Sequence, residues 1–196
     1  LIKSKNKNIK KIFHNLKKDY FLGKEKMLTS LSEDYRYSFG KKIIKKYKKF
    51  NNFRVIGMGG SILGTEAIYD FMKDKIKKNF SFFDNLVSQV DIKSNNKTVN
   101  LIISKSGNTL ETISNSNILI NNKKNIFIVE NQNSYLNDLA MKIKSEIIEH
   151  KNFIGGRYSV LSEVGMLPAE LMGLKPIKFK RFNYLVKNKS FVNQLI

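Results

Sequence analysis

The chain of 196 residues contains no cysteine and no tryptophan, and only two histidines and two prolines. Without cysteine it cannot form a disulfide, a thiolate nucleophile or a thiolate metal site. Two histidines, His14 and His150, are too few for a metal centre built from imidazoles. We therefore expect no disulfide scaffold, no cysteine chemistry and no metal site.

Long apolar runs are also missing from the sequence. No stretch approaches the ~20 apolar residues that a membrane-spanning helix requires. The basic stretch at residues 1–18 lacks the continuous apolar segment of a secretory signal. These observations predict a cytoplasmic protein without a membrane partner.

Negative charge is scarce: 36 lysines and arginines face 16 acidic residues, which gives a formal net charge of +20. One interpretation is binding to nucleic acid or to an anionic membrane. The lysines are spread along the chain, however, and no nucleic-acid reading motif accompanies them. Lysine, asparagine and isoleucine dominate throughout, as an AT-rich coding sequence would give. We expect a solvated basic surface and no nucleic-acid partner, with nucleic-acid binding as the alternative.

Apolar and helical patterns alternate along the chain. Strands are expected at residues 54–56, 98–103 and 125–129, and from residue 147 onwards. Helices are expected at residues 8–18, 34–49, 65–77, 134–145 and 161–172, and directly after residue 109. This alternation predicts an α/β fold with a parallel sheet. No linker divides the chain, and we expect an N-terminal helical segment at residues 1–50 followed by one domain at residues 51–196.

A first glycine-rich loop, residues 57–61, follows the first expected strand. Such a loop directs backbone N–H groups at a helix N-terminus, where an anion is favoured. A dinucleotide-binding fingerprint would need glycine where Ile62 stands. A Walker A loop would need Lys and Ser or Thr where Thr65 and Glu66 stand. The loop is either a phosphate-binding turn of another kind or a plain turn between strand and helix.

A second polar loop, residues 104–109, follows the strand expected at residues 98–103. It combines the hydroxyls of Ser104, Ser106 and Thr109 with the ammonium of Lys105. Hydroxyls and consecutive N–H groups can surround the oxygens of a phosphate without a metal. A helix cap needs only one of these side chains, so the loop favours phosphate binding over capping alone.

A third loop, residues 155–159, precedes the helix expected at residues 161–172. Gly155 and Gly156 let the backbone approach a ligand closely, and Arg157 can hold a developing negative charge. A surface arginine beside a flexible turn explains the same spacing. On spacing alone both interpretations stand.

Together, residues 55–64, 104–112 and 155–165 resemble the phosphoglucose isomerase family in sequence, order and spacing. The first two loops alone would indicate only the wider sugar isomerase (SIS) superfamily, and the arginine loop narrows the resemblance. It implies a flavodoxin-like, three-layer α/β domain with a parallel sheet flanked by helices. It also implies interconversion of glucose 6-phosphate and fructose 6-phosphate, in glycolysis and gluconeogenesis, without a metal or organic cofactor.

The resemblance also implies roles for individual residues. Ser104, Lys105, Ser106 and Thr109 would bind the sugar phosphate, and Gly60 and Ser61 would line the sugar site. Arg157 would stabilise the cis-enediolate that forms while a base moves a proton between C1 and C2.

One feature of the family is missing from this chain. Family members carry the glutamate base and a ring-opening histidine in a second SIS domain, and neither Glu163 nor His150 lies in those motifs. We expect an incomplete chain, the N-terminal SIS domain of an enzyme that is a homodimer at full length. Two alternatives are a non-catalytic SIS module that senses a sugar phosphate, and a bifunctional glucose/mannose-6-phosphate isomerase. The Gly107-Asn108 pair resembles the loops of the latter.

Overall fold

Five parallel strands form a single sheet in this computed structural model, which describes residues 26–86, 97–120, 123–130 and 133–181 and a few isolated positions nearer the ends. The strands are β1 (Asn52–Ile56), β2 (Asn79–Phe83), β3 (Thr98–Ile103), β4 (Asn125–Val129) and β5 (Glu146–Glu149). Their order in the sheet is β2-β1-β3-β4-β5, with every neighbouring pair parallel. This is the flavodoxin-like order, which confirms the predicted α/β fold and places a topological switch point between β1 and β3.

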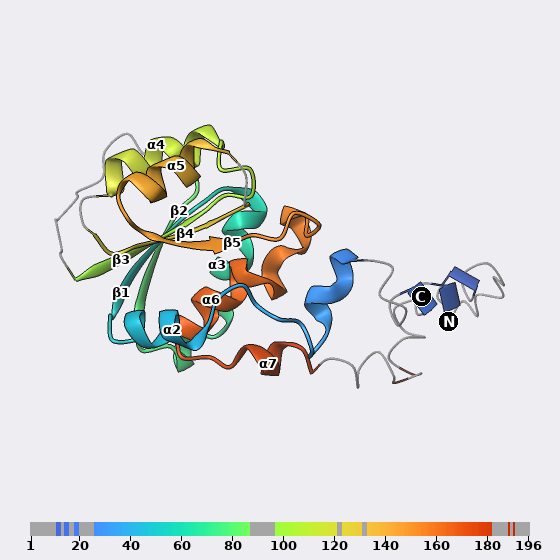
Figure 1. Ribbon diagram of the computed structural model, residues 1–196. Helices are drawn as coiled ribbons and strands as arrows, with labels where there is room; N and C mark the ends of the chain where they lie inside the picture. Colours follow the sequence, from blue (N-terminus) through green and yellow to red (C-terminus); the bar gives the residue numbers. More distant parts are fainter. Residues whose placement is uncertain are drawn as a thin grey trace.

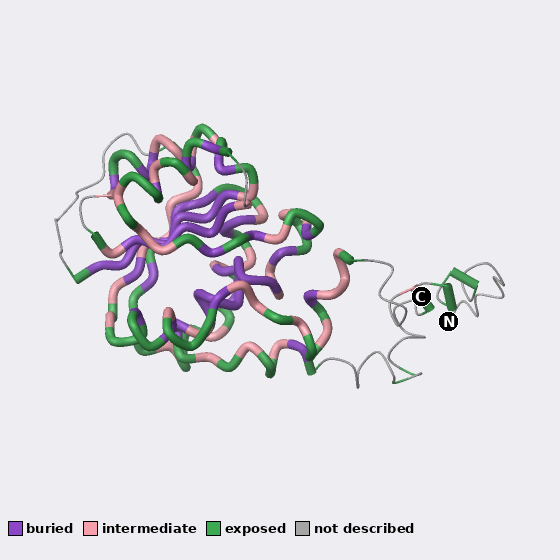
Figure 2. The backbone as a smooth tube through the Cα atoms, viewed as in Figure 1, coloured by how far each residue is buried: buried purple, intermediate pink, exposed green. Residues whose placement is uncertain are grey.

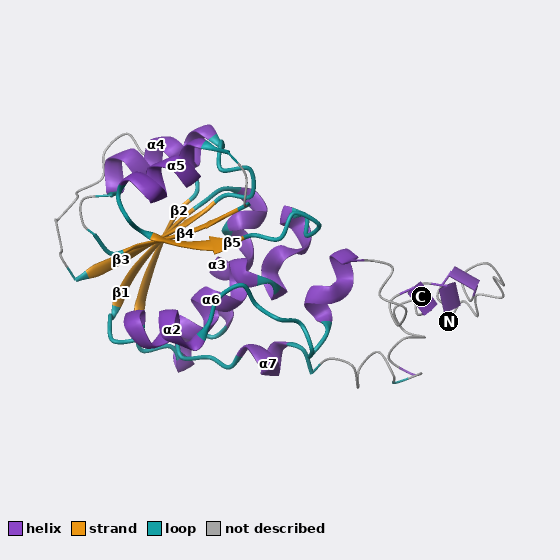
Figure 3. Ribbon diagram, viewed as in Figure 1, coloured by secondary structure: helices purple, strands orange, loops and turns teal. Residues whose placement is uncertain are grey.

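Helices cover both faces of the sheet, in three layers (Figures 1 and 3). One face carries α4 (Leu110–Leu119) and α5 (Tyr135–Lys142), and the other carries α2 (Lys41–Tyr47), α3 (Leu63–Phe71) and α6 (Glu163–Leu171). The short α7 (Pro176–Phe179) follows α6. The 3-10 helices are η1 (Lys26–Leu31), η2 (Gly59–Ser61), η3 (Lys73–Lys75) and η4 (Gly156–Leu161).

The central strands are buried along their whole length, as Figure 2 shows. Their side chains alternate between two apolar clusters. Leu101 and Ile103 pack toward α3 and α6, whereas Ile102 and Phe127 pack toward α4 and α5. A strand covered on both faces needs an almost continuous apolar run, which is why β3 and β4 match the predicted ranges.

The helix expected at residues 34–49 is wrong in its first half. Only residues 41–47 are helical, and Gly40 stands before them in an extended conformation (φ −115°, ψ 171°). Tyr35, Tyr37 and Phe39 follow a period of two, which does not suit one face of a helix. Residues 37–50 contribute side chains to the same apolar core as β1. The division of the chain into a helical segment and a domain at residue 50 stays a prediction. The helix expected at residues 8–18 falls mostly outside the described residues.

The helix expected at residues 161–172 is present as α6, and it is preceded by the 3-10 helix η4, which the sequence did not predict. Ser162 is extended (φ −91°, ψ −164°), and its side chain accepts a hydrogen bond from Val164 N. It therefore ends η4 and begins α6. Gly173 closes the helix with a positive φ of 95°, as the sequence predicted.

Lysines gather at the amino ends of the strands. They are Lys48 and Lys49 before β1, Lys77 and Lys78 before β2, Lys97 before β3, Lys123 and Lys124 before β4, and Lys144 before β5. In parallel strands this edge lies opposite the three polar loops, so these eight lysines are remote from the loops. Among the described residues, no helix is both long and apolar enough to cross a membrane.

Candidate functional site

The first loop leaves the sheet at the switch point. Gly57 follows β1, and its N–H donates to the carbonyl of Phe83 at the end of β2 (3.2 Å). A Cβ at Gly57 would lie 2.9 Å from the carbonyl oxygen of Ile103 at the end of β3. The chain therefore passes through a gap between neighbouring strand ends that only glycine fits. It continues into η2, where Ser61 is buried.

The first and third loops touch backbone to backbone. A Cβ at Gly60 would lie 2.2 Å from the carbonyl oxygen of Gly156, so no side chain fits there. The Ser159 hydroxyl donates to the carbonyls of Gly60 (3.1 Å) and Gly156 (2.7 Å). Segments about 100 residues apart in sequence are thus joined beside the switch point.

The second loop is organised by its own hydroxyls. Ser104 Oγ is 2% exposed, accepts a hydrogen bond from Gly107 N (3.2 Å) and is hydrogen-bonded to Thr109 Oγ1 (3.1 Å). Ser106 Oγ accepts from Asn108 N (3.2 Å) and belongs to an exposed residue. Gly107 has a positive φ of 67°, and a Cβ there would lie 2.1 Å from Ser134 Oγ. This tight turn delivers the hydroxyls of Ser104 and Thr109 to the start of α4.

The N-terminus of α4 has no side-chain cap. Thr109 occupies the N-cap position without accepting a hydrogen bond from the first turn of the helix. The first amides of a helix need an acceptor, and the helix dipole favours an anion there. The second loop therefore combines hydroxyls and uncapped N–H groups in one place.

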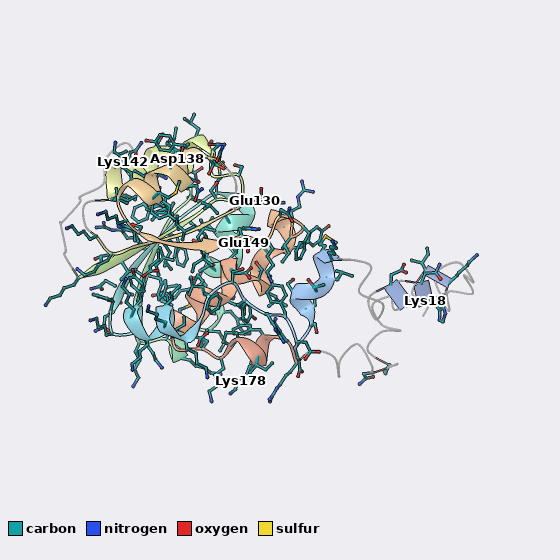
Figure 4. The ribbon with its side chains drawn as sticks, viewed as in Figure 1. Lys18, Glu130, Asp138, Lys142, Glu149 and Lys178 are labelled. Carbon is teal, nitrogen blue, oxygen red and sulfur yellow. The ribbon has the colours of Figure 1, made fainter. Side chains whose placement is uncertain are left out.

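Lys105 ties the second loop to the segment that leads to the third. Its ammonium lies 3.4 Å from a carboxylate oxygen of Glu130, which follows β4, and donates to the carbonyl of Asn152 (2.7 Å). Figure 4 shows Glu130 at this sheet edge near Glu149, the last residue of β5. The sequence predicted Lys105 as a site residue but gave no sign of its partners, which lie 25 and 47 residues away.

Arg157 projects from η4 as an exposed residue. Its guanidinium makes no hydrogen bond or ion pair with any residue that the structure describes. A guanidinium stays protonated at any physiological pH and offers a planar fork of donors. It is available to a ligand.

His150 lies at the carboxyl end of β5 and is 1% exposed. Its backbone N–H donates to Val129 O (2.7 Å), its Nδ1 lies 3.2 Å from Lys151 O, and its Nε2 has no hydrogen-bond partner among the described residues. Burial lowers the pKa of His150 below its usual value near 6.5. In the described ranges, no group of three or more metal-ligating side chains could hold an ion.

The lowered pKa of His150 predicts a loss of stability in acid. Below pH 6.5 the unfolded chain takes up a proton at this ring that the folded chain does not, so the free energy of unfolding falls as the pH falls. Urea titrations of the wild type and His150→Gln at pH 6.5 and 5.5 should give a smaller fall for the variant. Equal falls in the two proteins would contradict the burial of a neutral imidazole.

The match to known proteins covers most of the chain. The family model described as phosphoglucose isomerase matches residues 24–194. The glucose-6-phosphate isomerase of Methanocaldococcus jannaschii is 34% identical over 148 residues, which cover 67% of this chain and 36% of that protein. The glucose-6-phosphate isomerase of Aster yellows witches'-broom phytoplasma is 33% identical over 190 residues, 82% of this chain and 43% of that protein. The chain therefore spans less than half the length of these curated relatives.

Solved structures support the fold, and the family assignment follows. A hypothetical protein from Thermus thermophilus aligns with a TM-score of 0.61 at 22% identity, covering 71% of this chain and 38% of its own. Tagatose-6-phosphate ketose/aldose isomerase from Escherichia coli aligns with a TM-score of 0.53 at 14% identity, covering 71% and 44%. These likenesses concern the α/β fold alone. The family model and the curated relatives carry the assignment: the chain belongs to the phosphoglucose isomerase family.

Proposed function

We propose that this chain is the substrate-holding part of a glucose-6-phosphate isomerase, which interconverts glucose 6-phosphate and fructose 6-phosphate. The observation that carries the proposal is the convergence of the three polar loops at the switch point between β1 and β3. In open parallel sheets, ligands bind at this position. Membership of the phosphoglucose isomerase family supplies the reaction class.

The second loop would bind the phosphate group. The hydroxyls of Ser104, Ser106 and Thr109, the ammonium of Lys105 and the uncapped amides of α4 are the candidate donors. To bind the phosphate, the Lys105 ammonium would exchange its hydrogen bond to Asn152 O for one to the ligand and would stay paired with Glu130. Gly60 and Ser61 in η2 would line the adjoining sugar site.

Arg157 would stabilise the intermediate. A base removes the proton from C2 of the open-chain glucose 6-phosphate and returns it to C1, while the hydroxyl proton moves from the oxygen at C2 to the oxygen at C1. Between the two steps the electron pair is held as an enediolate. The negative charge rests on the oxygens at C1 and C2, where a permanent cation lowers its energy. Arg157 belongs to η4, which contacts η2 directly, so its backbone lies close to the proposed sugar site.

Proton transfer needs a group that this chain does not provide in the family's motifs. A general base must lie within hydrogen-bond reach of the proton that it removes. We propose that the base comes from the further length that the curated relatives have. We also propose that the complete enzyme is a cytoplasmic homodimer that uses no cofactor.

The phosphate assignment predicts a large loss of affinity in Ser104→Ala/Thr109→Ala. Each hydrogen bond to a charged group contributes ~1.5–3 kcal/mol, so loss of two should raise the dissociation constant for glucose 6-phosphate at least roughly 100-fold. Isothermal titration calorimetry on the chain measures this directly. Ser114→Ala, on the same α4 helix, is the matched control and should bind like the wild type. Unchanged affinity in the double variant would overturn the phosphate site.

A further inference from the structure

A polar segment lies over the core next to the third loop. We call residues 32–39, which join η1 to α2, the strap; it runs beside α6 in Figure 1. It is neither helix nor strand, and its position is set by three charged side chains from elsewhere in the chain. All three come from segments that flank or follow the third loop.

Glu163, the first residue of α6, is one of the three and is 0% exposed. Its carboxylate accepts hydrogen bonds from Tyr35 OH (3.0 and 2.9 Å), Ser38 N (2.9 Å) and Ser38 Oγ (3.2 Å). A buried carboxylate is costly unless its oxygens are fully hydrogen-bonded, and here every donor belongs to the strap. Burial and the Glu163 charge together raise the pKa of Tyr35, so its phenol remains a donor.

Two lysines also hold the strap. Lys151 Nζ donates to Arg36 O (2.7 Å) and lies 4.3 Å from the centre of the Tyr35 ring. Lys180 Nζ donates to Ser32 O (3.0 Å) and lies 4.7 Å from the same ring. A cation over an aromatic face adds to the attraction when it is partly desolvated. Burial lowers the pKa of Lys180 to about 8, which is still above neutral pH, so most of its ammonium groups stay charged at pH 7.

The strap is therefore joined to both ends of the segment that carries Arg157. Lys151 begins that segment and Glu163 ends it. Within this segment, Ser162 Oγ donates to Ser159 O (2.7 Å). In α6, Gly165 packs so closely on Val160 that a Cβ at Gly165 would lie 2.1 Å from the carbonyl oxygen of Val160. Movement of the start of α6 must therefore move η4. None of the hydrogen bonds described for the strap reaches the second loop.

We propose that Glu163 is a positioning residue: by holding the strap against the start of α6, it keeps Arg157 at the place where the enediolate forms. This inference rests on the role proposed above for Arg157. Glu163 touches no reacting atom, and none of the hydrogen bonds to its carboxylate involves a donor of the proposed phosphate site. The N-terminal residues 32–39 thereby become part of the site's architecture although they contribute no contact to the substrate.

Hydrogen exchange tests the mechanical half of this proposal without any ligand. In Glu163→Gln, amides of residues 151–161 should exchange at least about tenfold faster than in the wild type, while residues 104–112 keep their rates. Tyr35→Phe retains the ring under both lysines and should give a smaller change of the same pattern. Glu146→Gln, which removes an exposed pair with Lys46 at the other edge of the sheet, is the matched control and should leave both segments unchanged.

Calorimetry with two ligands tests the functional half. Glucose 6-phosphate reports the phosphate site, and 5-phosphoarabinonate carries a carboxylate where the enediolate would form. Glu163→Gln should bind the phosphorylated acid at least about fivefold more weakly than the wild type and should lose less affinity for glucose 6-phosphate, because a displaced arginine loses charge-assisted bonds to the carboxylate.

The outcomes separate the two proposals. Wild-type protein that binds neither ligand refutes the proposed function and, with it, the role of Arg157. Normal wild-type binding with no selective loss in Glu163→Gln overturns only the positioning role. Faster exchange over the whole sheet, or equal loss of both ligands, would mean that Glu163 serves general stability and would also overturn it. If Glu163→Gln does not fold, Tyr35→Phe decides by the same criteria.

Discussion

Replacing Arg157 with alanine is expected to lower kcat about 100- to 1,000-fold in the isomerase that contains this chain. Removal of one group that stabilises an oxyanion in the transition state typically costs that much. KM for glucose 6-phosphate should change little, because the phosphate is held by the second loop. The Arg157 guanidinium is exposed on η4 and has no competing partner among the described residues, so its loss leaves no buried group unsatisfied. Steady-state formation of fructose 6-phosphate measures both constants.

Two further variants sharpen this prediction. Arg157→Lys keeps the charge but not the planar fork of donors, so its kcat should fall between those of the wild type and Arg157→Ala. Arg181→Ala, an exposed arginine just after α7, is the matched control and should behave like the wild type. A rise in KM with kcat unchanged in Arg157→Ala would show that the arginine binds substrate uniformly and does not stabilise the enediolate.

Gly60→Ala is expected to lower the free energy of unfolding by about 3 kcal/mol and to abolish sugar-phosphate binding. The added methyl would lie 2.2 Å from the carbonyl oxygen of Gly156, and a backbone group cannot rotate away as a side chain can. Overpacking of this kind costs ~1–3 kcal/mol or more. It would force η2 away from η4 and break the bond from Ser159 Oγ to Gly60 O. Urea unfolding and calorimetry measure the two effects.

Gly155→Ala is the matched control for that variant. It adds a methyl group to the third loop, next to Gly156, and the closest contact of that methyl would be an ordinary 3.6 Å to the Tyr158 ring. Stability within about 0.5 kcal/mol of the wild type is expected. If Gly60→Ala and the wild type have the same midpoint of urea unfolding, the direct contact of the first and third loops does not exist in solution.

Local patterns in the sequence were enough to predict the central strands of the sheet and the three polar loops. β3 and β4 are mostly apolar because helices cover both faces, and a nearly continuous apolar run is visible without any knowledge of the fold. The glycines and hydroxyls at the ends of β1 and β3 likewise predicted turns at the carboxyl edge. Ser134 capped its helix as a serine in that position often does.

Other features depend on residues that are far apart in the chain. β2 (Asn79–Phe83) was not predicted, because it is a short strand at the sheet edge beside lysines and is only partly buried. The contact of Glu163 with Tyr35 joins residues 128 positions apart, and the pairing of Lys105 with Glu130 crosses from β3 to β4. No local periodicity encodes such partners. These contacts form only in the folded chain, where the parallel sheet brings successive strand ends to one edge and the strap packs on α6.

The central claim is that a sugar phosphate binds where the three loops meet, and an NMR titration tests it most directly. Glucose 6-phosphate added to uniformly 15N-labelled chain should shift the amide signals of residues 59–61, 104–112 and 155–159. Signals from Lys48, Lys77 and Lys124 at the opposite edge of the sheet should stay in place. Shifts confined to that lysine-rich edge, or none at millimolar ligand, would contradict the account.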